Sequence, residues 1–395
     1  MARRTLVAAV VVGGLAVGAT GCGGKHGVAI SVTPASATVD VPFAIRVDGL
    51  RPRQRIVLAF SGRSPSGARW RGHQQARANR SGVVSLPDDF VLARMRGPGR
   101  EVGAFPRRVR VAVDVRGGVQ VAASAERDPV SFASLKSTFE SPLKVGFFAR
   151  WDRPRGVRHH TAILLFGGSE GGLSESDLVT TLVAHGYPVL HLAYFREPGL
   201  PQDLTRIPLE YFRHALRWLA AQPEVDPRRI VTFGISRGGE LSLLLASTFP
   251  QLVRAAVGYV PFFEAVPSPS DPDEPAWTFH GDPVLGVIPV ERIAGPVFVA
   301  GGDQDGLWQS GLSVELIAQR LHDHGRRDVT ALEYPNAGHA LGFVLPVQTP
   351  ISARDYGIVD SQYGVLDLGG SPKADEAARE DAWPKLLAFL ARVGG

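Results

Sequence analysis

Short runs that alternate apolar and polar residues occupy the first third of the chain. They cover residues 29–32, 43–47, 56–60, 82–86 and 109–113, and Gly, Pro and Asp residues separate them. A period of two is typical of strands with one buried face, and no long helical pattern interrupts it. The sequence therefore predicts an all-β, immunoglobulin-like sandwich over residues 28–140.

From residue 141 onward, apolar strands alternate with amphipathic helices. Residues 161–166 are a continuous apolar run, which is typical of a strand covered on both faces. A helix over residues 208–222 would align four large apolar side chains on one side. Repeated alternation of this kind predicts an α/β domain over residues 141–395, with a mostly parallel sheet and helices on both faces. The Pro- and acid-rich residues 261–289 are expected to form a cap or another insertion.

A glycine-flanked serine occupies a sharp strand-to-helix turn of this domain. β-branched and aromatic residues at 230–233 lead into Gly234-Ile235-Ser236-Arg237-Gly238, and a helical pattern follows. The glycines let strand and helix pass closely, and the turn exposes the Ser236 hydroxyl at a helix N-terminus. The pattern alone also fits a serine in an ordinary turn. Its place between a buried strand and a helix favours a nucleophile.

Two later strands end in residues that can assist such a serine. Residues 296–300 run into Gly301-Gly302-Asp303-Gln304-Asp305, and residues 329–334 run into Pro335-Asn336-Ala337-Gly338-His339. The chain order serine, aspartate, histidine is that of α/β-hydrolases, in which His339 would be the base and an aspartate would orient it. Asp305 is preferred as that aspartate, and Asp303 is expected to cap the local turn.

A glycine-rich loop follows the apolar run 161–166. It reads Gly167-Gly168-Ser169-Glu170-Gly171-Gly172. A phosphate-binding loop is one interpretation, but the Rossmann spacing and the Walker lysine are absent. The favoured interpretation is the loop that supplies an N–H group to the oxyanion hole in α/β-hydrolases.

The first 22 residues have the pattern of an export signal. Arg3 and Arg4 precede the apolar run 6–17, and small residues lead to Cys22. That run is short for a membrane span. Small residues before a cysteine resemble the bacterial lipobox, so we expect Cys22 to be acylated and to anchor the exported protein to the outer face of the cell membrane, or its periplasmic side. An ordinary secreted protein is the alternative.

Composition limits the remaining chemistry. Cys22 is the single cysteine, so neither an intrachain disulfide nor a cysteine-based metal site is possible. The formal charge of +5 is mild, and the basic residues are mostly arginines scattered along the chain. We therefore expect a solvated basic surface and no nucleic-acid partner.

These motifs together resemble the family of acyl-CoA thioesterases and bile acid-CoA:amino acid N-acyltransferases. The resemblance is most specific in residues 234–240, 301–308 and 334–339, and the tail from Asp381 to Phe389 resembles the family's closing helix. It implies a β-sandwich followed by an α/β-hydrolase domain, with Ser236 as nucleophile, Asp305 as orienting acid and His339 as base. It further implies that the backbone N–H groups of the oxyanion hole are those of Ser169, Glu170 and Arg237.

The implied activity is hydrolysis of small-molecule acyl thioesters through an acyl-enzyme, without a metal or other cofactor. N-acyltransferase members use a cysteine nucleophile, so Ser236 favours water over an amine as the acceptor. An exported protein would meet little acyl-CoA, so a carboxylesterase or lipase acting on lipid or small esters is the alternative. A non-catalytic, lipid-anchored binding protein on a hydrolase fold is a further one. The sequence predicts no particular oligomeric state.

Overall fold

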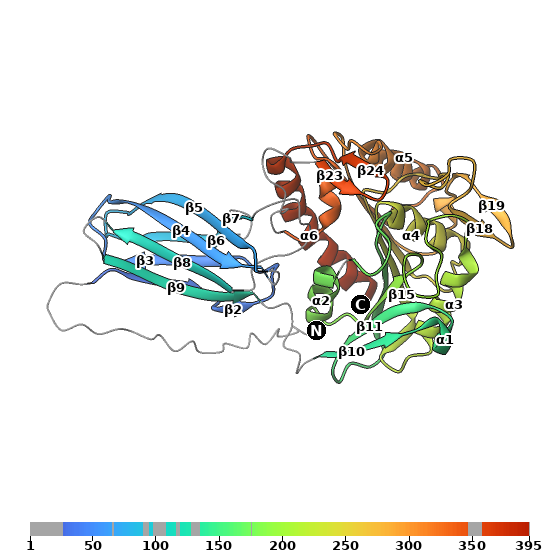
Figure 1. Ribbon diagram of the computed structural model, residues 1–395, viewed down its shortest axis with the longest axis horizontal. Coiled ribbons are helices and arrows are strands. Elements are labelled where there is room, and N and C mark those ends of the chain that lie inside the picture. The colour runs from blue at the N-terminus through green and yellow to red at the C-terminus, as the bar shows by residue number, and fades with distance from the viewer. Residues whose placement is uncertain are drawn as a thin grey trace, which may run out of the picture.

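The computed structural model describes residues 27–64, 67–89, 95–97, 108–115, 119–127, 135–174, 176–346 and 358–394. Within these residues, an N-terminal part made of strands precedes a C-terminal part made of one large sheet and its helices (Figure 1). The predicted leader and its acceptor Cys22 lie outside the described residues. No helix in the described part of the chain is both long and apolar enough to cross a membrane.

The N-terminal part contains two sheets. The smaller is formed by β1 (Ala29–Thr33), β3 (Phe43–Asp48) and β6 (Val84–Asp89). The larger has six strands, in the order β2 (Ser36–Ala37), β9 (Val119–Arg127), β8 (Arg108–Val115), β4 (Arg55–Arg63), β5 (Arg69–Arg77) and β7 (Met95–Arg96). Alternate residues of both sheets, such as Ile45 and Leu58, are buried in one core. The immunoglobulin-like character of this part stays a prediction.

The boundary between the two parts differs from the predicted one. β10 (Leu135–Glu140) pairs antiparallel with β11 (Phe148–Pro154), which in turn pairs with β13 (Val189–Ala193) of the large sheet. The short helix α1 (Pro142–Val145) connects β10 to β11. The prediction that the first domain extends to residue 140 is therefore wrong, because the backbone of 135–140 already belongs to the second sheet.

The large sheet has eight strands in the order β10, β11, β13, β12, β15, β16, β21 and β22. Neighbouring strands run parallel from β13 to β22, whereas β10 and β11 run antiparallel. Beside β11 and β13, the inner strands are β12 (His160–Phe166), β15 (Val225–Ile235), β16 (Ala255–Tyr259) and β21 (Val297–Gly302). The two edge strands are β10 and β22 (Val329–Tyr334). Parallel strands put their carboxyl ends at one edge, which is where an α/β sheet places its site.

Helices cover both faces of this sheet (Figure 1). Ile163 and Leu165 pack with α2 (Ser176–Ala184) and α6 (Pro372–Gly394) in one cluster. Ala162 and Leu164 point the other way and pack with α3 (Leu209–Ala220), α4 (Arg237–Thr248) and α5 (Ser310–Asp323). The continuous apolar run in β12 is thus explained by burial on two sides.

The predicted insertion 261–289 forms short strand pairs. β17 (Glu264–Ala265) pairs with β20 (Gly286–Val287), and β18 (Trp277–Phe279) pairs with β19 (Asp282–Val284) and with β14 (Ile207–Pro208). The remaining short elements are the 3-10 helices η2 (Val290–Arg292) and η3 (His339–Phe343) and the strands β23 (Ile358–Ser361) and β24 (Gly364–Asp367).

A buried polar contact joins the N-terminal part to the helices of the C-terminal part. Asp40 Oδ2 lies 2.7 Å from His185 Nε2, just after α2, and 3.0 Å from Trp383 Nε1 of α6. The His185 and Trp383 rings meet edge to face at 5.9 Å. One carboxylate therefore holds two segments of the neighbouring part.

Candidate active site

Ser236 stands between β15 and α4 in a strained turn. Its φ is 59° and its ψ is −123°, a conformation that residues with a side chain rarely adopt. A Cβ at Gly234 would lie 1.8 Å from the Gly238 carbonyl oxygen, and one at Gly238 would lie 2.3 Å from the Gly167 carbonyl oxygen. The two glycines around Ser236 are required because strand, helix and neighbouring loop pass too closely for any side chain.

The structure brings Ser236, His339 and Asp305 together from three separate strand ends. His339 Nε2 lies 3.0 Å from Ser236 Oγ, and His339 Nδ1 lies 2.8 Å from Asp305 Oδ2. The Asp305 side chain is fully buried and that of His339 is 9% exposed. An ionised carboxylate only accepts hydrogen bonds, so Nδ1 carries the proton and Nε2 is left to accept one from the serine hydroxyl.

Asp305 is fixed by its own loop. Its Oδ1 accepts hydrogen bonds from the backbone N–H groups of Leu307 at 3.0 Å and Trp308 at 3.3 Å. The Trp308 ring lies edge to face with the His339 ring at 5.1 Å, and its Nε1 donates to the Val260 carbonyl. Carboxylate and imidazole are therefore held by backbone groups and by an aromatic neighbour.

Asp303 has a different environment. Its Oδ1 accepts the Asn336 backbone N–H at 2.6 Å, so it ties the loop after β21 to the loop after β22. Asp303 was expected to cap its local turn, whereas this contact reaches a loop 33 residues further along the chain. Asp305 is the carboxylate beside His339.

The loop that carries His339 is clamped by residues that sequence reasoning missed. Asp375 of α6 accepts the Gly338 N–H at 2.6 Å, and Arg379 of α6 donates to the Ala340 carbonyl at 2.8 Å. The Leu368 carbonyl accepts both the His339 N–H, at 2.7 Å, and the Gly306 N–H, at 3.2 Å. Asp375 and Arg379 are fully buried, and a charged pair four residues apart on an otherwise buried helix face is the signal that could have found them.

The glycine-rich loop borders the serine. A Cβ at Gly168 would lie 2.9 Å from Ser236 Cβ, so this backbone passes directly beside it. Glu170 folds back over the loop, where Oε1 accepts the Gly168 N–H and the Ser174 hydroxyl, each at 2.8 Å. Of the predicted oxyanion groups, Ser169 and Glu170 thus follow the glycine that contacts Ser236, and Arg237 opens α4, where its N–H has no intrahelical partner.

The Tyr194 side chain contacts the same loop. Its hydroxyl oxygen lies 2.9 Å from the carbonyl oxygens of both Gly167 and Gly168, to which it can donate. Burial raises the pKa of Tyr194 well above its ordinary value, so the hydroxyl keeps its proton. Tyr194 directly follows β13 at the carboxyl edge of the sheet, a position that could have drawn attention to it.

A buried ion pair ties the first turn of α4 to the insertion. Arg237 Nη1 lies 2.6 Å from Glu240 Oε2, and Arg237 Nη2 donates to the Val266 carbonyl at 2.9 Å. Glu240 Oε1 accepts Trp277 Nε1 at 2.6 Å. Burial raises the pKa of Glu240 from 4.5 to about 7, against the lowering effect of the Arg237 guanidinium. The backbone around the serine is therefore coupled to the insertion that flanks it.

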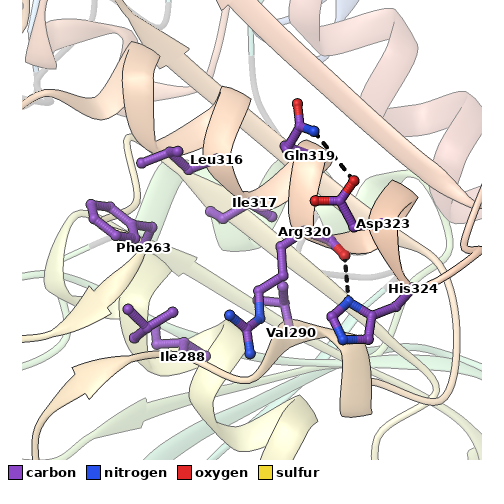
Figure 2. Close-up of a pocket in the computed structure, with 10 residues that line it drawn as sticks. Phe263, Ile288, Val290, Leu316, Ile317, Gln319, Arg320, Asp323 and His324 are labelled. Atoms are coloured by element: carbon purple, nitrogen blue, oxygen red, sulfur yellow. Dashed lines mark hydrogen bonds between the residues drawn. The ribbon is translucent and has the colours of Figure 1, made fainter.

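A surface cavity of about 320 Å³ lies elsewhere, between α5 and the segment that contains β20 and η2 (Figure 2). Phe263, Ile288 and Leu316 line its apolar side, and Arg320 and His324 lie at its polar side. None of Ser236, His339 and Asp305 lines it. Among the residues described, no group of three or more His, Cys, Asp or Glu side chains is placed to hold a metal ion.

Residues 207–262 and 281–393 match the protein family described as BAAT / Acyl-CoA thioester hydrolase C terminal. These two ranges make the C-terminal part of the chain similar to this family. The resemblance predicted from residues 234–240, 301–308 and 334–339 is confirmed, since all three motifs fall within the matched ranges.

Named relatives extend the similarity over most of the chain. "Acyl-coenzyme A thioesterase 6" of Homo sapiens is 26% identical over 406 residues, covering 89% of this chain and 93% of that protein. "Peroxisomal succinyl-coenzyme A thioesterase" of Mus musculus is 26% identical over 411 residues, covering 92% and 96%. Among solved structures, a putative dienelactone hydrolase from Klebsiella pneumoniae has a TM-score of 0.48 and 18% identity, covering 65% of this chain and 99% of that chain. The family and the relatives together support an enzyme of the hydrolase class.

Proposed function

We propose that the protein is a serine hydrolase that cleaves acyl thioesters through an acyl-enzyme. The observation that carries the proposal is the pair of contacts from His339, 3.0 Å to Ser236 Oγ and 2.8 Å to Asp305 Oδ2. The names of the related thioesterases support a thioester substrate of the acyl-CoA type.

Each step of the reaction uses a group already in place. Ser236 Oγ attacks the acyl carbonyl carbon while His339 Nε2 takes the hydroxyl proton, and Asp305 stabilises the imidazolium. The carbon–sulfur bond then breaks, and His339 returns the proton to the leaving thiolate. Water, activated by His339, attacks the acyl-enzyme and releases the acid and free Ser236.

The oxyanion of both tetrahedral intermediates would be held by backbone N–H groups. Those of Arg237, at the N-terminus of α4, and of Ser169 and Glu170, in the loop beside Ser236, are our candidates. Losing one such donor typically slows a reaction of this kind roughly 100- to 1,000-fold. The contacts of Tyr194 with the Gly167 and Gly168 carbonyls support a fixed loop.

A substrate panel tests the leaving group. Purified protein is assayed with acyl-CoA thioesters of increasing chain length and with p-nitrophenyl esters of the same acids, with Ser236→Ala as control. We expect turnover of both classes, higher kcat/KM on thioesters, and loss of both in the control. Strong ester turnover with negligible thioester turnover would replace the thioesterase by an exported esterase or lipase.

We also propose that the mature protein is a lipoprotein, which the acylated Cys22 holds at the outer face of the membrane. The N-terminal part that follows Cys22 would be an immunoglobulin-like sandwich. The sequence Ala19-Thr20-Gly21-Cys22 supports this location. Metabolic labelling with a palmitate analogue should mark the wild-type chain and not Cys22→Ser. Equal labelling of both would contradict the anchor.

A further inference from the structure

Arginines that are scattered along the sequence gather on one face of the six-stranded sheet. The positions between them, such as Leu58 and Trp70, are buried in the core. Because side chains alternate along a strand, the arginines all point outward. The exposed set is Arg55 and Arg63 of β4, Arg69, Arg71 and Arg77 of β5, and Arg108 and Arg110 of β8.

The strand register places several of these like charges directly opposite one another. Arg55 faces Arg77, and Arg63 faces Arg69. Like charges opposite each other on one sheet face are destabilising. A surface that only had to stay soluble would intersperse both signs.

Few carboxylates balance this face. Glu126 of β9 accepts a hydrogen bond from Arg108 Nε at 3.0 Å. The register places Asp114 of β8 opposite Val57. Among the strand residues of this face whose side chains the structure describes, Glu126 is the acidic one. The resulting field attracts an extended negative surface more than a single anion, because the arginines spread over three neighbouring strands.

We propose that this arginine face, defined by the seven exposed arginines above, binds the surface of an anionic phospholipid bilayer. The choice of a bilayer rests on the proposed acylation of Cys22. Six residues separate Cys22 from Ala29, the first residue of β1. Even fully extended, such a tether keeps β1 within about 25 Å of an anchored cysteine. That distance lets the domain lie with its arginine face on the lipid headgroups.

Bilayer binding would orient the active site as well as strengthen the anchor. Arginine near an anionic leaflet strengthens partitioning roughly fivefold per residue, and salt screens the effect. The buried contacts of Asp40 with His185 and Trp383 join the N-terminal part to α2 and α6. A face held on the membrane therefore sets the direction in which the carboxyl edge of the large sheet points.

The test uses residues 23–395, which lack the leader and Cys22, so that an acyl anchor cannot contribute. This chain contains every described residue. It is sedimented with vesicles of phosphatidylcholine alone or mixed with phosphatidylglycerol, at low and high salt. We expect binding to the mixed vesicles only, and its loss at high salt. Equal partitioning to both vesicle types, or to neither, would overturn the proposal.

The variants separate the arginine face from overall charge. Arg55→Gln/Arg69→Gln/Arg71→Gln should weaken partitioning roughly 100-fold. A matched control, Arg217→Gln/Arg327→Gln/Arg392→Gln, removes the same charge from exposed positions of the C-terminal part and should change it little. Equal losses in the two triple variants would contradict a defined face. So would binding of the wild-type chain to single-stranded RNA with no binding to the mixed vesicles.

Two further measurements, of unfolding temperature and of ester hydrolysis, show whether the arginine substitutions act through folding or through catalysis. The arginine-face variant should unfold at the same or a higher temperature than wild type, because it relieves the Arg55–Arg77 and Arg63–Arg69 oppositions. A lower unfolding temperature would show that these arginines serve the fold, which overturns the proposal. Hydrolysis of a soluble ester should be unchanged in both variants, so failure of membrane binding is distinguishable from failure of the proposed hydrolase.

Discussion

Asp303 and Asp305 are two residues apart and have different roles, because the backbone of their loop determines which carboxylate reaches His339. Asp305 Oδ2 reaches His339 Nδ1, whereas Asp303 accepts the Asn336 backbone N–H. Sequence alone could place both at the end of a strand, and it favoured Asp305. The direction in which each side chain leaves the loop is a property of the folded backbone, which the sequence pattern does not encode directly.

Substituting each aspartate by asparagine separates these roles. Asp305→Asn should lower kcat roughly 10⁴-fold, because the amide no longer fixes the productive histidine tautomer or stabilises the imidazolium. Asp303→Asn keeps an oxygen that can accept the Asn336 N–H and should change kcat only a fewfold. Steady-state kinetics on a p-nitrophenyl ester measures both. Comparable losses in the two variants would contradict the assignment.

Most strands and helices of the C-terminal part could be predicted from the sequence, whereas the contacts that hold them together could not. The continuous apolar run predicts β12, and the helical spacing of apolar residues predicts α3. β5 was missed because its exposed positions are mostly charged and its half-buried ones include Gly72 and Gln74. The Leu368 carbonyl accepts the backbone N–H groups of His339 and Gly306, so no side-chain pattern marks these contacts.

The buried Glu240 should make stability depend on pH in a defined direction. Its folded pKa is raised from 4.5 to about 7, so the unfolded chain loses this proton first. The contribution of Glu240 to the free energy of unfolding is therefore fully present below the unfolded pKa. It falls by up to about 3 kcal/mol as pH rises toward about 7. Glu240→Gln keeps an oxygen for Trp277 Nε1 and should lose this dependence.

Denaturant unfolding across this pH range measures the effect of Glu240→Gln against wild type. Glu274→Gln is the matched control, because Glu274 pairs with Arg206 on the surface and is 40% exposed. The control should follow the wild-type pH curve. If Glu240→Gln follows it too, the Glu240 carboxyl does not titrate between the two states as described.

The two parts of the molecule meet through a carboxylate that spans a long sequence separation. Burial by itself would raise the pKa of Asp40, but hydrogen bonds from His185, Thr38 and Trp383 outweigh it, and the pKa is lowered. The tail helix was predicted from its resemblance to the family, whereas its contact with Asp40 was not. A lone aspartate in a loop between strands has no periodic signature that would pair it with residue 383.

Asp40→Ala should lower the free energy of unfolding by about 1 to 3 kcal/mol, because the buried donors of His185 and Trp383 lose their acceptor. A lowered carboxyl pKa means that the wild-type advantage is present above the unfolded pKa and is lost as pH falls through the folded one. Thermal unfolding at neutral and acidic pH measures this. Asp48→Ala, which removes an exposed pair with Arg46, should cost at most about 1 kcal/mol. Equal shifts in both variants would contradict a structural joint at Asp40.

Stoichiometric labelling with a fluorophosphonate tests whether Ser236 is the nucleophile. Peptide mass spectrometry should find one adduct per chain, on Ser236, and hydrolysis should fall in proportion to labelling. Ser236→Ala should take no label at that peptide and should lose activity roughly 10⁶-fold. Hydrolysis that persists after complete labelling, or that proceeds at the wild-type rate in Ser236→Ala, would show that Ser236 is not the nucleophile.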